Sequence, residues 1–411
     1  MSRLRALLAR AVHSPWGWIA IGAGLRLGHI LTLGNRYYFA DTIEYEAAAL
    51  RILHGFGVDQ VTPRAPLYPL LMAASFWIGG EGHFLFTRIV TLILSVALMG
   101  VAARLAHRFG GRPAATLTAV GMALSPTIVF VAGLLYPTTL YMLLVLSFTL
   151  VAWDLSERPG LARGALLGGL FALGWLTDQV FLAPALAAGL WSFLHRARPR
   201  ARFLRAVGLA VVVATSVALP YLSLLQRAGG DGVFMRKAQT VLHSARTDRE
   251  LSRERWLRLP PDAPFRAYSP VGFVRSEARL FANAPVAYVH DWFWEFLHFF
   301  RPMADRVQSQ NRYTQRSILL FGSMHFVALL TLALLGLGIG AGPRDGRLLL
   351  AGVVLATAAF YSFFFTQTRY RIPVESHLVV LAALGIQRAF PRATAWLAGG
   401  GAPIERVRAD T

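Results

Sequence analysis

The sequence contains no cysteine and only one lysine, Lys237, among its 411 residues. The lack of cysteine excludes a disulfide framework, a thiolate metal site and a thiol nucleophile. Charged residues are also scarce, at 15%, whereas a water-soluble domain carries about a quarter. This shortage disfavours an ordinary soluble enzyme. With 55% hydrophobic residues, the chain is predicted to be an integral membrane protein.

The basic residues are almost all arginine, and they outnumber the acidic residues by 41 to 21. On a membrane protein, basic side chains commonly fix the orientation of the helices or contact lipid phosphates. We therefore predict membrane lipids, and no nucleic acid, as partners of this charge.

Apolar runs long enough to cross a bilayer recur along the chain, since a transmembrane helix needs about 17 to 25 mostly apolar residues. The first run begins too far into the chain, and is too long, to be a cleavable signal peptide. The sequence predicts an all-α polytopic membrane protein. About ten transmembrane helices are expected, at residues 15–33, 84–106, 113–132, 136–153, 163–178, 179–195, 203–223, 317–341, 347–365 and 373–390.

Arginines gather in the connections on one side of this arrangement. One cluster lies at 104–112, between the second and third spans, and a denser one lies at 196–205, between the sixth and seventh. The two tails of the chain are also basic. Because short Arg-rich loops stay in the cytoplasm, both termini are predicted to be cytoplasmic. The expected location is the cytoplasmic membrane of a bacterium.

Two segments on the opposite side, 34–83 and 224–316, are too long to be simple turns. Within the first, the apolar stretch 66–79 is short for a span and is opened by prolines, so it predicts a juxtamembrane helix at the outer interface. The second segment, with its proline clusters, predicts a small extracytoplasmic helical layer. The predicted division is an N-terminal transmembrane module, this loop layer, and C-terminal transmembrane helices with a cytoplasmic tail, at 1–223, 224–316 and 317–411.

An acidic motif, YYFADTIEYEAAALRILHGFG, begins where the first span reaches the outer surface. Asp41 occupies the position of a helix N-cap, and Glu44 three residues later has the spacing of a capping box. Asp41 could therefore serve only as a cap. The aromatic residues before it, however, hold the turn at the interface, where a partly desolvated carboxylate is well suited to accept a proton from a hydroxyl. Capping and catalysis are compatible.

Three outer arginines are candidates for binding an anionic group. Arg64 stands just before the interfacial helix, where a guanidinium can bind a lipid phosphate through two hydrogen bonds or simply extend to the headgroups. Arg369, Tyr370 and Arg371 lie in the short outer turn between the last two spans. Basic residues there contradict the charge rule. Either a phosphate ligand, or pairing with Glu375 or with acids of the long loop, would explain them.

Ionisable residues inside the spans need partners, because a charge at membrane depth is costly. Arg26 and Arg88 are two of them, and Arg88 is near enough to the outer end of its span to snorkel. Asp178 lies at an outer turn, facing either the same cavity as Asp41 or an arginine in an ion pair. Tyr68, on the interfacial helix, is a further candidate for this cavity. The histidines show no zinc-ligand spacing, and there is no nucleotide-binding loop.

The order of these motifs resembles the GT-C superfamily of integral-membrane glycosyltransferases. The arrangement is close to the family 39 type, which includes protein O-mannosyltransferases and the aminoarabinose transferase of lipid A. The resemblance implies a GT-C fold, with Asp41 as the base for the acceptor and with Arg64, Arg369 and Arg371 at the lipid phosphate. It rests on ADTIEYEAAALRILHG, RAPLYPLLMA, FTRIVTLILSVALMGVAARLAHRFGG, ALSPTIVFVAGLLYPTTLYMLLVL, NAPVAYVHDWFWEFLHFFRP and RYRIPVESHLVVLAAL.

One departure from that pattern concerns metals. Many relatives have an acid after the Tyr-Pro of the second outer loop, where this chain has Thr138. Threonine cannot ionise, so no cofactor and no divalent metal are expected.

The resemblance implies transfer of a sugar, with inversion, from a polyprenyl-phosphate donor to an acceptor hydroxyl on the extracytoplasmic side. The acceptor, whether a protein, a lipid or a glycan, is not specified. The alternatives are a transporter or flippase of an anionic lipid or solute, and a non-catalytic envelope scaffold. Further residues expected in the same cavity are Glu44, Tyr68, Asp178 and Tyr370.

Overall fold

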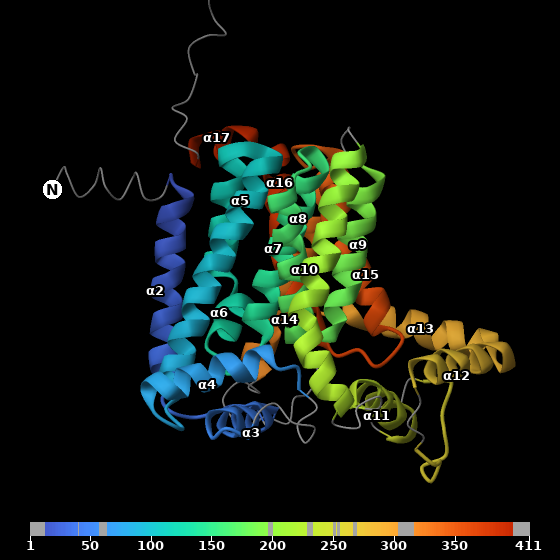
Figure 1. The fold of residues 1–411 in the computed structure, drawn as a ribbon. Coiled ribbons are helices and arrows are strands. Elements are labelled where there is room, and N and C mark those ends of the chain that lie inside the picture. Colours follow the sequence, from blue (N-terminus) through green and yellow to red (C-terminus); the bar gives the residue numbers. More distant parts are fainter. Residues whose placement is uncertain are drawn as a thin grey trace, which may run out of the picture.

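The computed structural model of the chain describes residues 13–39, 41–56, 64–195, 200–227, 233–249, 252, 255–265, 269–302 and 316–397. Every regular element within these residues is a helix, which confirms the predicted all-α class. Figure 1 shows one group of helical elements side by side as an upright bundle. They are α2 (Pro15–Leu33), α5 (Phe84–Leu124), α6 (Pro126–Ala132), α7 (Thr138–Glu157), α8 (Leu161–Thr177), η1 (Gln179–Phe181), α9 (Leu182–Leu194), α10 (Arg200–Arg227), α14 (Arg316–Ile339), α15 (Arg344–Tyr361) and α16 (Ile372–Ala389).

The helix ends follow local sequence signals. Ser14 and Ser125 cap α2 and α6, and each is followed by proline at the first helical position, where proline costs no hydrogen bond. The 41-residue α5 contains the second predicted span and the start of the third. Its chain direction reverses at Gly111, whose φ of 70° is a left-handed conformation that glycine tolerates. The predicted third span therefore consists of the end of α5 and α6.

By length and composition, four of the described helices could cross a membrane: α5, α7, Arg200–Ser223 and Leu320–Ile339. The shorter apolar helices are Leu67–Gly79, Leu161–Thr177 and Gln179–Leu194. Most of each of the ten predicted ranges is helical. The chain is therefore a multi-pass membrane protein, and the number of ten spans stays a prediction.

The two ends of the bundle differ. The start of α2 and the short α17 (Pro391–Leu397) lie at the upper end in Figure 1. The lower end carries α3 (Asp41–Leu53), α4 (Leu67–Gly79), α11 (Val233–Thr247), α12 (Pro270–Asn283) and α13 (Pro285–Phe299), which we call the outer layer. Both long segments predicted to share one side therefore do so. Which end faces the cytoplasm stays a prediction, and the arginines at 1–12, 196–199 and 398–411 lie outside the described residues.

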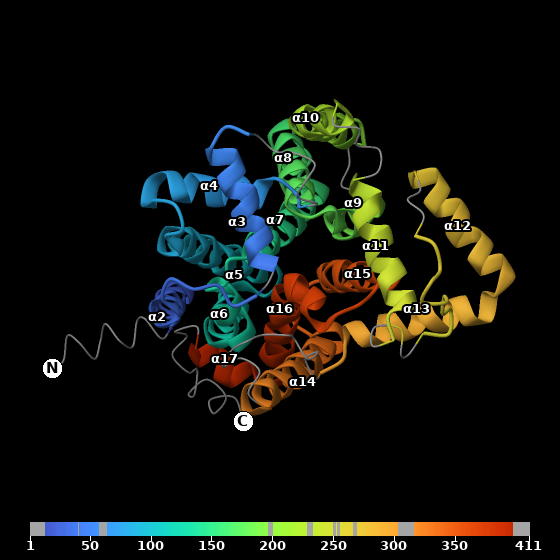
Figure 2. The same ribbon diagram turned by 90° about the horizontal axis from the view of Figure 1, so that it is seen from below.

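The predicted juxtamembrane helix at 66–79 is present as α4. It is 13 residues long, and it lies across the ends of the bundle helices rather than along them (Figure 1). Figure 2, from below, shows α3 over the bundle end beside α4. This pair brings the first outer segment over the middle of the molecule.

One hydrophobic core joins the beginning and the end of the chain. It includes Met99 of α5, Val145 of α7, Val353 of α15 and Val380 of α16, all almost completely buried. The N-terminal and C-terminal transmembrane parts thus share a core, so the fold carries residues from both ends of the chain to the outer layer. The boundaries predicted between modules, after residue 223 and after residue 316, stay a prediction.

Close helix pairs depend on glycine. A Cβ on Gly336 of α14 would lie 1.8 Å from the carbonyl oxygen of Leu381 in α16, and one on Gly164 of α8 would lie 2.1 Å from that of Ala206 in α10. No larger side chain fits without moving the backbone. These pairs approach as membrane helices do when small residues line their interface.

The buried arginines bind backbone carbonyls. Arg88 is almost completely buried, and it donates from Nε to the carbonyl oxygen of Gly133 at 3.1 Å. It also donates to the carbonyls of Gly34 and Arg36, so the snorkelling prediction is wrong. Its guanidinium instead fixes the turn that leads from α2 to α3. Arg26 is likewise buried and donates to two carbonyls and one serine hydroxyl.

Candidate active site

Asp41 is the first residue of α3, rather than the residue before it. The start of α3 is attached to the turn between α6 and α7, because the hydroxyl of Thr42 donates to the carbonyl of Leu135 at 3.4 Å. Glu44 pairs with Arg64 (Nε to Oε2, 2.7 Å), and the capping box stays a prediction. The carboxylate of Asp41 makes contacts across the site.

The Asp41 carboxylate lies between two arginines from distant parts of the sequence. Arg369 Nη1 is 3.2 Å from Oδ2, and Arg64 Nη2 is 3.4 Å from Oδ1. The hydroxyl of Tyr136, in the turn between α6 and α7, also donates to Oδ2. We call Asp41, Glu44, Arg64, Tyr136 and Arg369 the acid–arginine cluster. The side chain of Asp41 remains 28% exposed, so the carboxylate is still accessible from outside.

The arginines of the cluster keep their charge. Burial alone would lower the pKa of each, but nearby tyrosines and carboxylates raise the pKa of both above the usual value. Arg64 also lies over the ring of Tyr45, 4.9 Å from its centroid, as in a cation–π contact. The Nε of Arg369 is buried, whereas the side chain as a whole is 40% exposed. The exposed part of the guanidinium is available to an anionic ligand.

Tyrosines form the wall behind the cluster. The ring of Tyr45 meets those of Tyr68 and Tyr136 edge-on, each with centroids 5.3 Å apart. Burial raises the pKa of all three, so their phenols stay protonated at neutral pH. Tyr68, predicted as a cavity residue, is almost completely buried behind Tyr45. Tyr370 stacks on Tyr361, with centroids 4.5 Å apart, and supports the turn that carries Arg369.

The two arginines of the RYR turn point to different partners. Arg371 is buried, its Nε lies 3.3 Å from Oε1 of Glu375, and it donates to the carbonyl of Arg301. Its guanidinium also lies 3.5 Å from the centroid of the Phe326 ring. The pairing with Glu375, one of the two alternatives from the sequence, is therefore present. Of the two arginines, it is Arg369 that contacts Asp41.

Asp178 has a local structural contact. It precedes η1, and its Oδ1 accepts from the backbone N–H of Val180 at 3.0 Å. Its charge nevertheless reaches the site: after burial and the effect of Arg64, it contributes to the raised pKa of Tyr45. Asp178 thus lies near the tyrosine wall while it caps its own turn.

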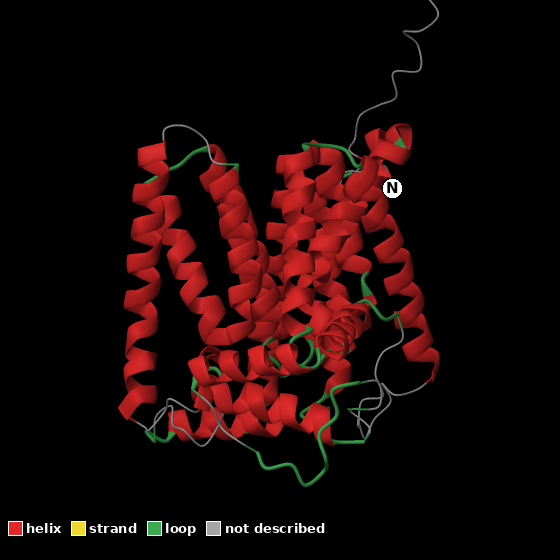
Figure 3. Ribbon diagram, turned by 90° about the vertical axis from the view of Figure 1, so that its right-hand side faces the viewer, coloured by secondary structure: helices red, strands yellow, loops and turns green. Residues whose placement is uncertain are grey.

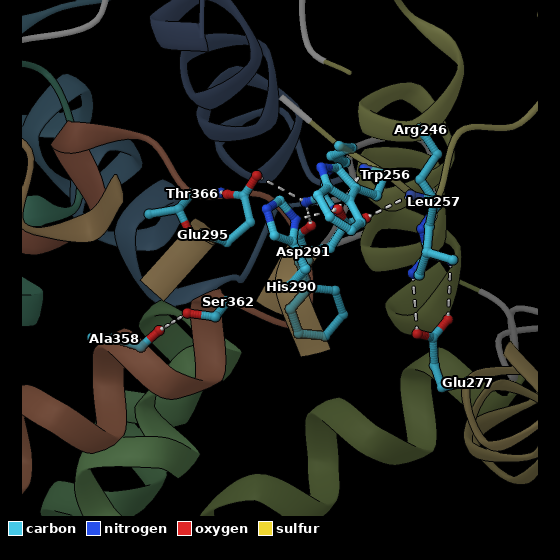
Figure 4. Close-up of polar contacts among 12 residues, drawn as sticks. Arg246, Trp256, Leu257, Glu277, His290, Asp291, Glu295, Ala358, Ser362 and Thr366 are labelled. Atoms are coloured by element: carbon cyan, nitrogen blue, oxygen red, sulfur yellow. Dashed lines mark hydrogen bonds and ion pairs between the residues drawn. The ribbon is translucent and has the colours of Figure 1, made fainter. Parts of the chain in front are cut away.

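A buried ion pair holds the segment that leads to Arg369. Glu295 of α13 accepts from the backbone N–H of Thr366 at 2.6 Å and lies 3.3 Å from Nη2 of Arg255. Arg255 also donates to the carbonyl of Phe364. Figure 4 shows the side chain of Glu295 pointing at Thr366. The interactions fix the backbone three residues before Arg369.

Sequence reasoning missed Tyr136, Arg255 and Glu295 as members of this arrangement. Tyr136 stands in the LLYPTTLY motif, two residues before Thr138. Glu295 is one of two acids in an otherwise apolar helix, and a buried acid of this kind needs a partner. That pattern was the available signal.

We expect Glu295→Ala to lower the free energy of unfolding by about 3–5 kcal/mol, because it leaves the buried Arg255 unpaired. Thermal unfolding in detergent measures the change. Glu81→Ala, which breaks the exposed contact of Glu81 with His54, is the matched control, and we expect a loss of about 0–1 kcal/mol. Equal losses in the two variants would show that the Glu295 contacts do not brace the segment.

Comparisons with known proteins begin with two negative results: no family model matches the sequence, and neither does any curated protein. Solved structures do match. ArnT from Cupriavidus metallidurans bound to undecaprenyl phosphate aligns over 93% of this chain with a TM-score of 0.58 and 16% identity. The archaeal oligosaccharyltransferase AglB from Archaeoglobus fulgidus, in complex with an inhibitory peptide and a dolichol-phosphate, aligns over 93% with a TM-score of 0.59 and 14% identity.

This chain has the GT-C fold of membrane glycosyltransferases. The apo state of the same ArnT gives a TM-score of 0.53. The alignments cover 62% of ArnT and 51% of AglB, so the chain spans only part of the length of either protein. In this fold, the acid–arginine cluster lies where the outer layer meets the bundle.

Proposed function

We propose that the protein transfers a sugar from a polyprenyl-phosphate donor to an acceptor hydroxyl at the extracytoplasmic membrane surface. The observation that carries the proposal is the contact of Asp41 with Arg369 and Arg64. It places a carboxylate able to accept a proton beside two permanent positive charges. The GT-C fold is consistent with it, and the two similar proteins were solved with a polyprenyl or dolichol phosphate.

The proposed reaction is a single displacement. The acceptor oxygen attacks the anomeric carbon while its proton passes to the carboxylate of Asp41. The bond from the anomeric carbon to the phosphate oxygen breaks, and its electron pair leaves with the lipid phosphate. Because there is one attack, from the face opposite the leaving group, the configuration inverts.

Arg64 and Arg369 would stabilise the departing phosphate. Charge stabilisation of this kind is commonly the largest contribution to an enzyme's rate. The guanidinium of Arg369 suits a ligand that arrives from outside, because the side chain is 40% exposed. Arg371, which is bound to Glu375, has a structural contact instead.

Purified protein in vesicles with a radiolabelled polyprenyl-phosphate sugar tests the proposal. We expect release of free polyprenyl phosphate together with sugar transfer when an acceptor extract is added. Movement of the intact donor across the bilayer without cleavage would identify a transporter. If neither transfer nor movement occurs, the protein is a non-catalytic scaffold. Either of these two results would overturn the proposal.

We expect Tyr136→Phe to lower the turnover rate about tenfold, because Asp41 loses one hydrogen bond worth about 1–2 kcal/mol. Burial raises the pKa of Tyr136, so the wild-type phenol donates throughout the neutral range. The release of polyprenyl phosphate gives the rate. Tyr288→Phe is the matched control, since the Tyr288 hydroxyl donates to Glu277 in the outer layer, at 3.1 Å. If Tyr136→Phe is as fast as this control, the hydroxyl of Tyr136 does not contribute to the reaction.

Removing divalent metals should leave the transfer rate unchanged. Among the described residues, no group of three His, Asp or Glu side chains could hold a metal ion. Thr138 begins α7 at the position where many relatives have an acid. The two arginines can supply the positive charge that a metal would provide. Loss of transfer in EDTA, restored by added Mg²⁺ or Mn²⁺, would contradict this expectation.

A further inference from the structure

The helix α13 has its polarity reversed relative to a helix in water. The stripe that faces the protein carries its two acids, Asp291 and Glu295, both buried. Asp291 accepts from the backbone N–H groups of Trp256 and Leu257 at 2.5 and 3.0 Å. Figure 4 shows Asp291 directed at Trp256 and Leu257, and Glu295 at Thr366. A surface helix in water has its charged residues on the outer face.

The outward stripe of α13 is apolar along its whole length. Val286 is 74% exposed and Phe293 is 52% exposed, and Val289 and Leu297 share this face. These residues are spaced three or four apart, so they form one continuous face. Trp294, beside the stripe, is exposed as well. The face extends over about three helical turns. Such a continuous face differs from single apolar residues scattered over a surface.

The neighbouring α12 also has exposed apolar residues, and it adds positive charge. Val271 and Val274 are exposed, and so are Arg275 and Arg279. The acid of this helix, Glu277, points inward to Arg246 at 3.3 Å (Figure 4). The outward side of α12 is therefore apolar and basic.

The position of the two helices fits a membrane interface. Figures 1 and 2 agree that α12 and α13 project sideways from the bundle at its outer end. Figure 3 shows the bundle helices standing upright above the outer layer. A helix that projects sideways at this level reaches the zone where headgroups meet acyl chains.

We propose that the outward faces of α12 and α13 dock into the outer leaflet of the membrane. Val286, Val289, Phe293 and Leu297 enter the boundary of the acyl chains, and Arg275 and Arg279 bind lipid phosphates. Helices with an apolar face and flanking arginines bind this zone, and tryptophan is enriched there. This inference stands independently of the sugar transfer.

The lack of native cysteine permits a direct test by spin labelling in vesicles of phosphatidylethanolamine and phosphatidylglycerol. Val289→Cys and Phe293→Cys place the label on the proposed face. Two references bracket them: Ile93→Cys, an exposed position within α5, and Asp262→Cys, an exposed position in the loop before α12. The accessibility of each label to oxygen and to a water-soluble nickel complex gives its depth.

We expect both α13 labels to be more accessible to oxygen than to the nickel complex, as at Ile93, with Asp262 showing the reverse. Nickel accessibility equal to that at Asp262 would put α13 in water and overturn the proposal. Labels shielded from both reagents would mean that a second copy or another protein covers the face, which would also overturn it. Because no step depends on sugar transfer, an inactive preparation still gives a result.

Discussion

Asp41→Asn is expected to lower the turnover rate about 10²–10⁴-fold, the usual contribution of a general base. Asparagine has nearly the same shape, and its oxygen can still accept from Tyr136 and Arg369. It cannot take the proton of the acceptor hydroxyl. Release of radiolabelled polyprenyl phosphate under saturating donor measures the effect.

Donor binding separates this role from a structural one. Because the substitution removes a negative charge next to Arg64 and Arg369, the KM for the donor should stay the same or fall. Glu81→Gln, an exposed acid of the same outer side that contacts His54 at 2.8 Å, should behave as wild type. An Asp41→Asn enzyme with wild-type turnover would end the general-base proposal.

Arg369→Gln is expected to lower the turnover rate about 10²–10³-fold, the cost of removing one preorganised group that stabilises transition-state charge. It should also raise the KM for the donor, because in the proposed reaction the guanidinium binds the lipid phosphate before and during the transfer. Arg369→Lys should recover only part of the rate. A lysine is a point charge and cannot contact a carboxylate and a phosphate in the way that a planar guanidinium can.

Arg36→Gln is the matched control for Arg369. It removes the same charge from an exposed position on the same outer side, between α2 and α3. We expect the control to change turnover less than twofold, since exposed charges away from a site contribute little. If the two variants lose the same activity, the general positive field of the outer surface matters and the specific contact of Arg369 does not.

The architecture was predictable because its signals are local. Apolar length identifies a membrane helix, and arginine-rich connections identify its side. The helix α4 was expected from the apolar stretch 66–79 and the two prolines that open it. The exception is the snorkelling expected of Arg88. Arg88 binds the carbonyls of Gly34 and Arg36 instead. These carbonyls lie in the turn between α2 and α3, which is near Arg88 only in the folded protein.

The site was predictable in its candidates but not in its contacts. Asp41, Arg64 and Arg369 attract attention as charges beside apolar segments on the outer side, and the structure brings them together. Arg369 and Arg371 are indistinguishable in the sequence, two residues apart in one motif. The 3₁₀ turn η3 (Thr368–Arg371) sends one toward α3 and the other toward α16.

The amino-acid sequence alone determined that this chain is a helical membrane protein, which of its segments share a side, and which charges need an explanation. Each of these follows from the cost of placing polar groups in hydrocarbon, which acts within a single helix or loop. The tertiary structure alone decided that Tyr136 would join Asp41, that Arg369 rather than Arg371 would contact Asp41, and that Glu295 would hold the segment before Arg369. Those choices depend on contacts between residues up to 328 positions apart, which no local pattern encodes.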